Sequence, residues 1–518
     1  MPRTIVNYAR NGSLILGALV LGLGASASML AIQPDRAAPK AAGSASGRPP
    51  MQIGVNVTGS IYYGSERIFA NLAQGAGAWK DPANAWKVMT PDKLTAAGFP
   101  LTNGTLAINV PQPVWAGKDV AVVCTWAGRG TVRLDGDARA GAFGHRVSFT
   151  WPGKKGPGRP NVLIYLTGSD ARDPFRDLDC REPGLVANGQ FDQRYVDDMK
   201  PFRVLRFLDW SNTNGNPAAV TWASRTTLAK SGNDGVALEH MIDLANATGS
   251  DPWFTVAYNA DETYVRNMAK LVHDRLKPGH RAYFELSNEI WNFQFPVATQ
   301  TLNEGVAEKL STDKYSNGLM RYAEKTIWMH KLLTQAFADD PRRLVRVVSS
   351  QNDNSWVART IMSFRDTPQW VDALATAPYF GHSFFKAPYD KSTVADLPAL
   401  FERLEALRAN SIAKALENKA VADRYGKRYI TYEAGQHLIA PSGPLIPVME
   451  AMQRSPLMGE AYDRFLADWK AQIGDTITLY SATGGVSQYG AWGMREYPGQ
   501  PLAQAPKQRA VMAALAGR

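Results

Sequence analysis

The sequence predicts an α/β protein whose main body is a (β/α)8 TIM barrel, with an antiparallel β-sheet module inserted between the first and second barrel strands. After residue 190, short apolar segments alternate with helical patterns, and the segment at 53–57 completes a set of eight candidate strands. The stretch 91–185 differs because it carries only β-type segments. An open doubly wound sheet is the alternative, but no Gly-x-Gly-x-x-Gly or Walker-type loop follows any strand.

The eight barrel strands are expected where runs rich in Val, Ile, Leu and aromatic residues end in polar residues. In chain order they are 53–57, 204–208, 253–258, 283–287, 344–349, 373–379, 429–432 and 477–481. Apolar residues recur at helical spacing between them, which predicts helices at 236–247, 264–276, 319–337, 356–364, 397–425, 461–473 and 511–515. The barrel therefore comprises residues 51–90 and 186–518.

The inserted module, 91–185, is predicted from short segments rich in Val, Thr and Ile that Gly, Pro, Asn and Asp interrupt. Its strands are expected at 105–110, 120–126, 131–134, 147–151 and 162–167. Both cysteines of the chain, Cys124 and Cys180, fall in this region. Export would permit a disulfide between them, which we favour over two free thiols.

The N-terminus has the pattern of an export signal. Arg3 and Arg10 precede an apolar run at 14–23, and Ala25-Ser26-Ala27 offers a cleavage site, so 1–27 is expected to be a signal peptide. An uncleaved anchor is the alternative. Residues 28–50, rich in Ala, Pro, Gly and Ser, read as a flexible linker. We expect a secreted, periplasmic or cell-envelope protein with no stable membrane span after cleavage.

The charge balance constrains the partners. The formal net charge is +10, which would suit an acidic polysaccharide or an anionic cell surface. The basic residues form no stripe interleaved with aromatics, so a nucleic-acid partner is not expected. Fourteen Trp and nineteen Tyr provide many flat faces on which a sugar ring could stack.

Two predicted barrel strands end in glutamates. Glu289 follows the fourth strand beside Asn288, and Glu433 follows the seventh. Because the C-terminal ends of barrel strands share one mouth, these carboxylates are expected to face each other there. One protonated and one ionised carboxylate can together break a glycosidic bond, by retention or by inversion according to their separation. Asn288 could hydrogen-bond the sugar hydroxyl beside the reacting carbon.

Ser-Asn-Glu-Ile-Trp-Asn after the fourth strand, with Tyr-Glu-Ala-Gly at the seventh, resembles glycoside hydrolase clan A, the retaining (β/α)8 glycosidases. The resemblance covers roughly 190–500 and the first strand. It implies that Glu289 is the acid/base and Glu433 the nucleophile. It further implies that Arg206 is the clan's strand-two arginine, Tyr379 the aromatic partner of the nucleophile, and Trp492 the strand-eight tryptophan.

Other side chains near strand ends are candidates for substrate contact. Trp210, Trp291 and Trp492 could be sugar platforms or core residues, and His382 and His437 could bind sugar hydroxyls, tune a glutamate or simply pack. Alternation along the fourth strand would point Glu285 into the barrel. No cluster of residues has metal-ligand spacing, so no metal and no cofactor are expected.

These observations lead us to expect an exported retaining hydrolase of a β-linked poly- or oligosaccharide, possibly an acidic one. A non-catalytic carbohydrate-binding protein, or an envelope protein of polysaccharide assembly, on the same barrel is the alternative. The sequence fixes neither the sugar nor the linkage, because the loops after the strands determine both. Transglycosylation would use the same two glutamates as hydrolysis.

Overall fold

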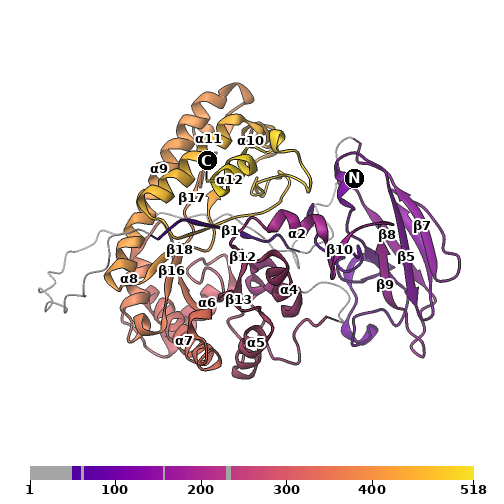
Figure 1. The fold of residues 1–518 in the computed structure, drawn as a ribbon, viewed down its shortest axis with the longest axis horizontal. Coiled ribbons are helices and arrows are strands. Elements are labelled where there is room, and N and C mark those ends of the chain that lie inside the picture. The colour runs from indigo at the N-terminus through magenta and orange to yellow at the C-terminus, as the bar shows by residue number, and fades with distance from the viewer. Residues whose placement is uncertain (1–48, 60–63, 156–157, 229–234, 518) are drawn as a thin grey trace, which may run out of the picture.

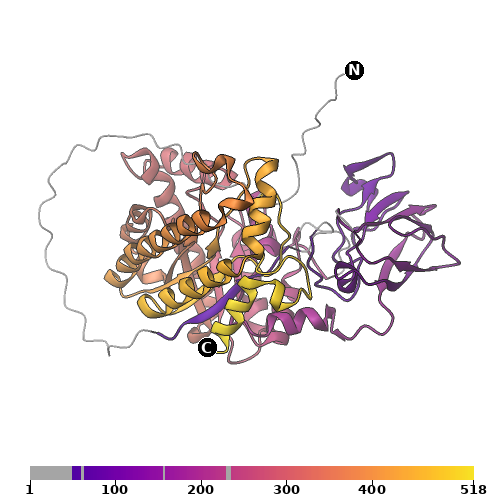
Figure 2. The ribbon, with the colours of Figure 1, turned by 90° about the horizontal axis from the view of Figure 1, so that it is seen from above.

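The computed structural model describes residues 49–59, 64–155, 158–228 and 235–517. The predicted signal peptide and residues 28–48 of the predicted linker lie outside them. Two bodies stand side by side in Figures 1 and 2: a barrel wrapped in helices, and a smaller β-module drawn in indigo and purple. Within the described ranges, no helix combines the length and the apolarity that crossing a membrane requires.

The barrel is an eight-stranded, all-parallel sheet in the order β18-β16-β15-β14-β13-β12-β1-β20, as predicted. Its strands in chain order are β1 (Gln52–Asn56), β12 (Val204–Arg206), β13 (Asp251–Val256), β14 (Ala282–Leu286), β15 (Leu344–Ser349), β16 (Ala373–Thr376), β18 (Arg428–Thr431) and β20 (Thr476–Leu479). Between β1 and β12 the chain leaves to form the module. The fold is therefore a (β/α)8 TIM barrel with an inserted antiparallel β-structure.

Side chains close the barrel between its seventh and eighth strands. The Thr431 hydroxyl on β18 accepts from the Thr478 N–H at 2.6 Å and donates to the Thr478 carbonyl at 3.3 Å. Asn56 at the end of β1 reaches across the same seam, donating to the carbonyls of Tyr432 and Leu479. These buried hydroxyl and amide groups bind backbone groups on both sides of the seam between β18 and β20.

Helices cover the outside of the barrel (Figure 1). They are α2 (Gln193–Met199), α3 (Leu208–Ser211), α4 (Leu238–Thr248), α5 (Glu262–Arg275), α6 (Pro296–Ala307), α7 (Lys314–Ala336), α8 (Ser355–Ser363), α9 (Leu397–Arg424), α10 (Ile446–Arg454), α11 (Pro456–Gln472) and α12 (Pro506–Leu515). Asp261 and Asp313 begin α5 and α7 by accepting backbone N–H groups of the first turn. The main apolar core lies between strands and helices, and a smaller one, which includes Trp253 and Tyr283, fills the barrel.

The module is built from two antiparallel sheets around its own core. One is β3-β2-β4-β8-β6 and the other β7-β5-β9. The strands are β2 (Lys80–Asp81), β3 (Asn84–Val88), β4 (Gly104–Ala107), β5 (Val120–Ala127), β6 (Thr131–Gly136), β7 (Arg146–Trp151), β8 (Val162–Thr167) and β9 (Arg176–Arg181); the short helix α1 (Gln112–Trp115) lies between β4 and β5. Cys124 and Cys180 are directly paired on β5 and β9 and form a disulfide, as favoured from the sequence.

The predicted boundary at residue 91 is wrong. β2 and β3 already belong to the module sheet, and the module core begins at Leu72. The chain enters and leaves the module at one place. There Phe69 forms a β-bridge with Phe191, and the Ala70 N–H donates to the Gln190 carbonyl. The strand pair β10 (Ala187–Asn188) and β11 (Phe191–Asp192) then returns the chain to the barrel.

Candidate active site

Three strand ends bring charged side chains to the same mouth of the barrel. Arg206 is the last residue of β12, Glu289 lies three residues beyond β14, and Glu433 lies two residues beyond β18. The strands are parallel, so their C-terminal ends open on the face where barrel enzymes place catalytic groups. The structure thus brings the two predicted glutamates and the predicted arginine together.

Arg206 is the centre of the site's hydrogen-bond network. Its Nη1 donates to Glu433 Oε1 at 2.8 Å and to Asn56 Oδ1 at 3.0 Å. Its Nε and Nη2 donate to Glu285 Oε2, and Nη2 also reaches Asn288 Oδ1 at 3.0 Å. The guanidinium is planar and rigid, and it binds four acceptor residues while fully buried. It therefore fixes the orientation of all four side chains at once.

Arg206, which the resemblance matches to the clan's strand-two arginine, has a side chain that is 0% exposed. Arg206 positions Glu433 and Glu285 instead of touching a ligand. Glu285 points into the barrel, as strand alternation predicted, and also accepts from the indole N–H of Trp253 at 2.9 Å. Burial raises the pKa of Glu285, and the guanidinium of Arg206 opposes that rise.

Glu433 is held at both oxygens. Arg206 donates to Oε1, and the hydroxyl of Tyr379 donates to Oε2 at 2.8 Å. The residue keeps 6% of its surface exposed, so it is enclosed but open towards the mouth. Glu433 is therefore held in one orientation through both of its carboxyl oxygens.

Glu289 has a different environment. Tyr432 donates its hydroxyl to Oε1 and Asn292 donates its amide to Oε2, each at 2.9 Å. Burial and the nearby charge of Glu433 raise the pKa of Glu289 to about 7. The two neighbouring carboxyl groups thus have different environments: Glu433 is bound by a guanidinium, while Glu289 holds its proton near neutral pH.

The backbone that carries Glu289 lies in an uncommon conformation. Ser287 and Glu289 both have positive φ, 59° and 42°. Such left-handed residues other than glycine cost about 1–3 kcal/mol each and are concentrated at functional sites. Between them stands Asn288, which is buried; it accepts from Arg206 and donates to Asn214 at 3.0 Å. The turn exposes Glu289 to the mouth while the network holds Asn288.

Aromatic rings form a wall beside Glu433. Tyr379, Tyr480 and His437 surround Trp492, with ring centroids 5.5, 5.7 and 4.5 Å from it. His382 lies against His437 at 5.1 Å, and burial lowers the pKa of His437 to about 3, so that imidazole is neutral. The structure thus gathers four of the predicted residues into a wall beside Glu433.

The assignment of Trp492 to the end of the eighth strand is wrong. β20 ends at Leu479 and Tyr480 occupies that position, while Trp492 returns to the wall from the following loop. The buried amino group of Lys507 holds this loop by donating to the carbonyls of Ala491 and Trp492 at 2.7 and 3.3 Å. Trp492 therefore belongs to the site by tertiary contact and not by strand register.

Trp210 is not a sugar platform. It is 1% exposed, packs against Phe69 and Phe207, and donates its indole N–H to the Thr58 carbonyl. Trp291 is half-buried and packs against Tyr432, 6.3 Å between centroids, so it supports the tyrosine that contacts Glu289.

Several residues of the site were not singled out from the sequence: Tyr432, Asn292, Trp253, Asn56, Asn214, Tyr480 and Asp209. Tyr432 and Asn292 could have been found, because each lies within three residues of a predicted glutamate. Asp209 follows β12 beside Gly59, and burial and the charge of Glu433 raise its pKa to about 6.

Across the part of the chain that the structure describes, no group of His, Cys, Asp and Glu has the arrangement of a metal site.

No protein-family model matches the chain, and no curated protein matches it. The solved structures that it resembles are glycoside hydrolases. A 4-O-α-L-rhamnosyl-β-D-glucuronidase from Fusarium oxysporum is 13% identical over 62% of this chain and 63% of its own, with a TM-score of 0.38. This chain thus spans less than two thirds of that enzyme's length.

Two further glycoside hydrolases resemble the chain at similarly low sequence identity. A xylanase from Cellvibrio japonicus is 9% identical over 80% of this chain and 92% of its own, with a TM-score of 0.36. An endo-β-1,4-mannanase from Thermotoga petrophila is 12% identical over 63% and 73%, with a TM-score of 0.34. No individual glycosidase family is assigned to this chain.

Proposed function

We propose that this protein is a retaining glycoside hydrolase that cleaves β-linked poly- or oligosaccharides. The observation that carries the proposal is the contrast between Glu433, bound by Arg206 and Tyr379, and Glu289, whose pKa is raised to about 7. A retaining glycosidase requires such a pair: an oriented carboxylate nucleophile and a carboxylic acid that keeps its proton near neutrality.

In the first step Glu433 attacks the anomeric carbon as the glycosidic bond breaks. Glu289 transfers its proton to the departing oxygen, so the leaving sugar departs as an alcohol and a glycosyl ester forms on Glu433. In the second step the Glu289 carboxylate removes a proton from water, which attacks the same carbon and releases Glu433. Two inversions give net retention.

The surrounding residues support this cycle. Arg206 and Tyr379 orient Glu433 for attack and favour it as a leaving carboxylate in the second step. The wall of Tyr379, Tyr480 and Trp492 offers flat faces beside the reacting carbon, where an aromatic π-face attracts the C–H groups of a sugar ring. Asn288, Trp291, His382 and His437 are proposed to line the sugar site.

We also propose that the protein is exported to the periplasm, the cell envelope or the medium. The N-terminal signal pattern supports this. So does the Cys124–Cys180 disulfide, because such bonds persist in oxidising compartments. Fractionation of the producing cells, with mass spectrometry of the mature N-terminus, tests it: cytoplasmic protein with an intact leader would contradict export.

The function is tested with aryl β-glycosides and a panel of β-glucans, xylans, mannans and acidic polysaccharides. Proton NMR of the first product should show the β-anomer before mutarotation; the α-anomer would exclude retention. Glu433→Ala should abolish turnover, and azide should restore it with formation of an α-glycosyl azide. A folded parent chain that hydrolyses none of the panel, but binds one member, would favour the non-catalytic carbohydrate-binding alternative.

A further inference from the structure

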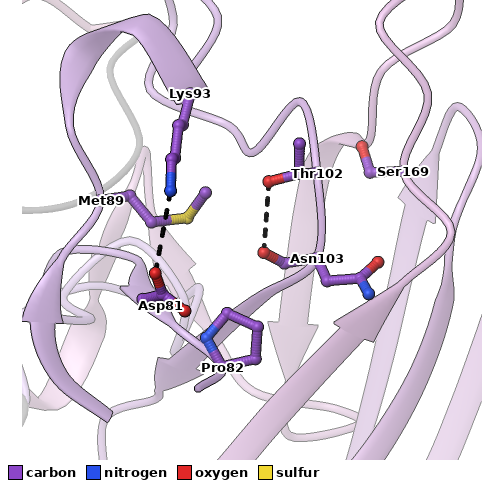
Figure 3. A pocket seen from close by; sticks show the side chains of 7 residues that line it. All are labelled: Asp81, Pro82, Met89, Lys93, Thr102, Asn103 and Ser169. Carbon is purple, nitrogen blue, oxygen red and sulfur yellow. Dashed lines mark hydrogen bonds and ion pairs between the residues drawn. The ribbon is translucent and has the colours of Figure 1, made fainter. Parts of the chain in front are cut away.

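The β-module contains a cavity that the proposed hydrolysis does not use. It has a volume of about 310 Å³ and is lined by Asp81, Pro82, Met89, Lys93, Thr102, Asn103 and Ser169. Figure 3 shows these side chains around one hollow. They come from the end of the five-stranded sheet where β4 begins and β8 ends, and from the 3-10 helix Pro91–Lys93. The volume lies at the small end of the range of about 300–1,000 Å³ for ligand sites, enough for one or two sugar rings.

Some polar groups of this cavity keep hydrogen-bonding capacity, whereas the Ser169 hydroxyl is already used, donating to the Pro100 carbonyl and accepting from the Phe175 N–H. Lys93 Nζ lies 3.8 Å from Asp81 Oδ2, well beyond the 2.7–2.9 Å or so of a charge-assisted hydrogen bond. The side-chain oxygen of Asn103 is already engaged, because it accepts from the Gly168 N–H at 2.9 Å. The Thr102 hydroxyl has only a long contact, 3.5 Å, to the Asn103 carbonyl.

This arrangement suits hydroxyl groups better than ions. A hydroxyl both donates and accepts, so a single one can bridge the gap by donating to Asp81 and accepting from Lys93. An ionic ligand would attract one of these two side chains and repel the other, and it would have to separate them. Met89 and Pro82 add apolar surface on which the C–H face of a ring can rest (Figure 3).

We propose that this cavity is a second glycan-binding site, which takes one or two residues of an uncharged polysaccharide chain. The site belongs to the module, whose core and sheets are separate from the barrel. It would hold a polymer on the protein without taking part in bond cleavage. The proposal does not depend on the proposed hydrolysis, because a non-catalytic protein could use the same cavity.

The test uses the full chain carrying Glu433→Gln, so that no probe is consumed. Affinity electrophoresis measures retardation by soluble β-glucan, xylan and glucomannan, with polygalacturonate as the anionic probe. Thr102→Trp fills the cavity from an exposed position, and Lys93→Met removes one donor while keeping the stem. Lys118→Met is the matched control, since it removes the same charge from an exposed position outside the cavity lining.

We expect at least one neutral polysaccharide to retard the parent chain. Both cavity substitutions should weaken its binding about tenfold or more, and Lys118→Met should leave it unchanged. Equal binding by parent and Thr102→Trp, binding of no probe, or preference for polygalacturonate would overturn the proposal. Aryl glycoside turnover, measured without the Glu433 change, should be the same in all three variants. Failure of hydrolysis alone would leave the cavity site standing.

Discussion

Tyr432 and Glu289 join the two proposed catalytic groups: the residue immediately before Glu433 donates its hydroxyl to Glu289 Oε1 at 2.9 Å. One short backbone segment therefore carries both the proposed nucleophile and a hydrogen-bond donor to the proposed acid. A displacement of the turn after β18 would move both the attacking carboxylate and the hydrogen bond that orients the proton donor. Trp291, from the loop that carries Glu289, packs on the same tyrosine ring.

Tyr432→Phe should shift the proton affinity of the acid. The tyrosine hydroxyl stabilises the ionised form of Glu289 and lowers its pKa, so its loss should raise that pKa further. The basic limb of the kcat/KM profile should then move to higher pH, with a moderate loss of rate. Profiles from pH 4 to 9 check this. Tyr165→Phe in the module is the control, and a basic limb displaced downwards would contradict the assignment.

Glu289→Gln should remove the basic limb altogether. In the parent chain the acid loses its proton as pH rises through about 7, so kcat/KM should fall above that value. The variant should lose about 10²–10⁴-fold on glycosides with poor leaving groups. It should lose much less on dinitrophenyl glycosides, which need no proton. Equal losses on both substrate types would show that Glu289 is not the acid.

The same substitution should stabilise the protein at neutral pH. Because the pKa of Glu289 is raised in the folded state, the folded chain retains a proton that the unfolded chain loses near pH 4.5. The parent's stability relative to Glu289→Gln should therefore decline as pH rises from about 4.5 to about 7. We expect a difference on the order of 1–3 kcal/mol by urea unfolding at pH 8 and little at pH 4. A larger advantage of the variant at pH 4 would contradict this.

Arg206→Met should unfold or severely weaken the barrel. It leaves Glu285 and Glu433 without their buried cation, and breaking a buried ion pair from one side costs about 3–5 kcal/mol. Adding Glu285→Gln should restore part of the stability, because one uncompensated charge is gone, but not the activity, because Glu433 stays unoriented. Urea unfolding of both variants, with kcat/KM, checks this. Additive losses in the double variant would refute the coupling.

Thr431→Val should weaken the closure between β18 and β20. The substitution keeps the side-chain shape but leaves the buried Thr478 N–H without its acceptor, which costs about 1–3 kcal/mol. Thr431→Ser retains the hydroxyl and should lose less. The comparison of Tm for the two variants is the measurement; a serine variant no more stable than the valine variant would show that packing, and not the hydroxyl, closes the seam.

Much of the barrel is predictable from the sequence because its strands are buried and apolar and its polar residues mark their ends. Glu289 and Glu433 could be placed on one mouth for this reason. The network around them could not, since Arg206 takes its acceptors from β1, from β14 and from the segment after β18, which meet only in the folded barrel. Trp210 could not be placed either. A tryptophan just after a strand looks the same in sequence whether its side chain lies in the barrel mouth or, as here, in the core.

The module was less predictable for a different reason. β2 has only two residues, both charged, and β9 is mostly charged, so neither has an apolar run. In β9 the signal is weak alternation, with Leu178 and Cys180 on the buried face. The module therefore begins before residue 91, the boundary that the sequence predicts. Trp492 reaches the site through a loop that Lys507 holds, a contact that no periodicity encodes.

The position of β1 between β20 and β12 has a consequence for the order of folding. The first barrel strand needs partners from residues 476–479 and 204–206, so the barrel cannot close until nearly the whole chain has been made. The module can fold before the rest of the chain is made, because its core residues all lie between Leu72 and Cys180. Because the N-terminal part of a chain emerges first during synthesis, the module can fold and form its disulfide before the barrel does. The barrel would then assemble around a strand already tethered to a finished domain.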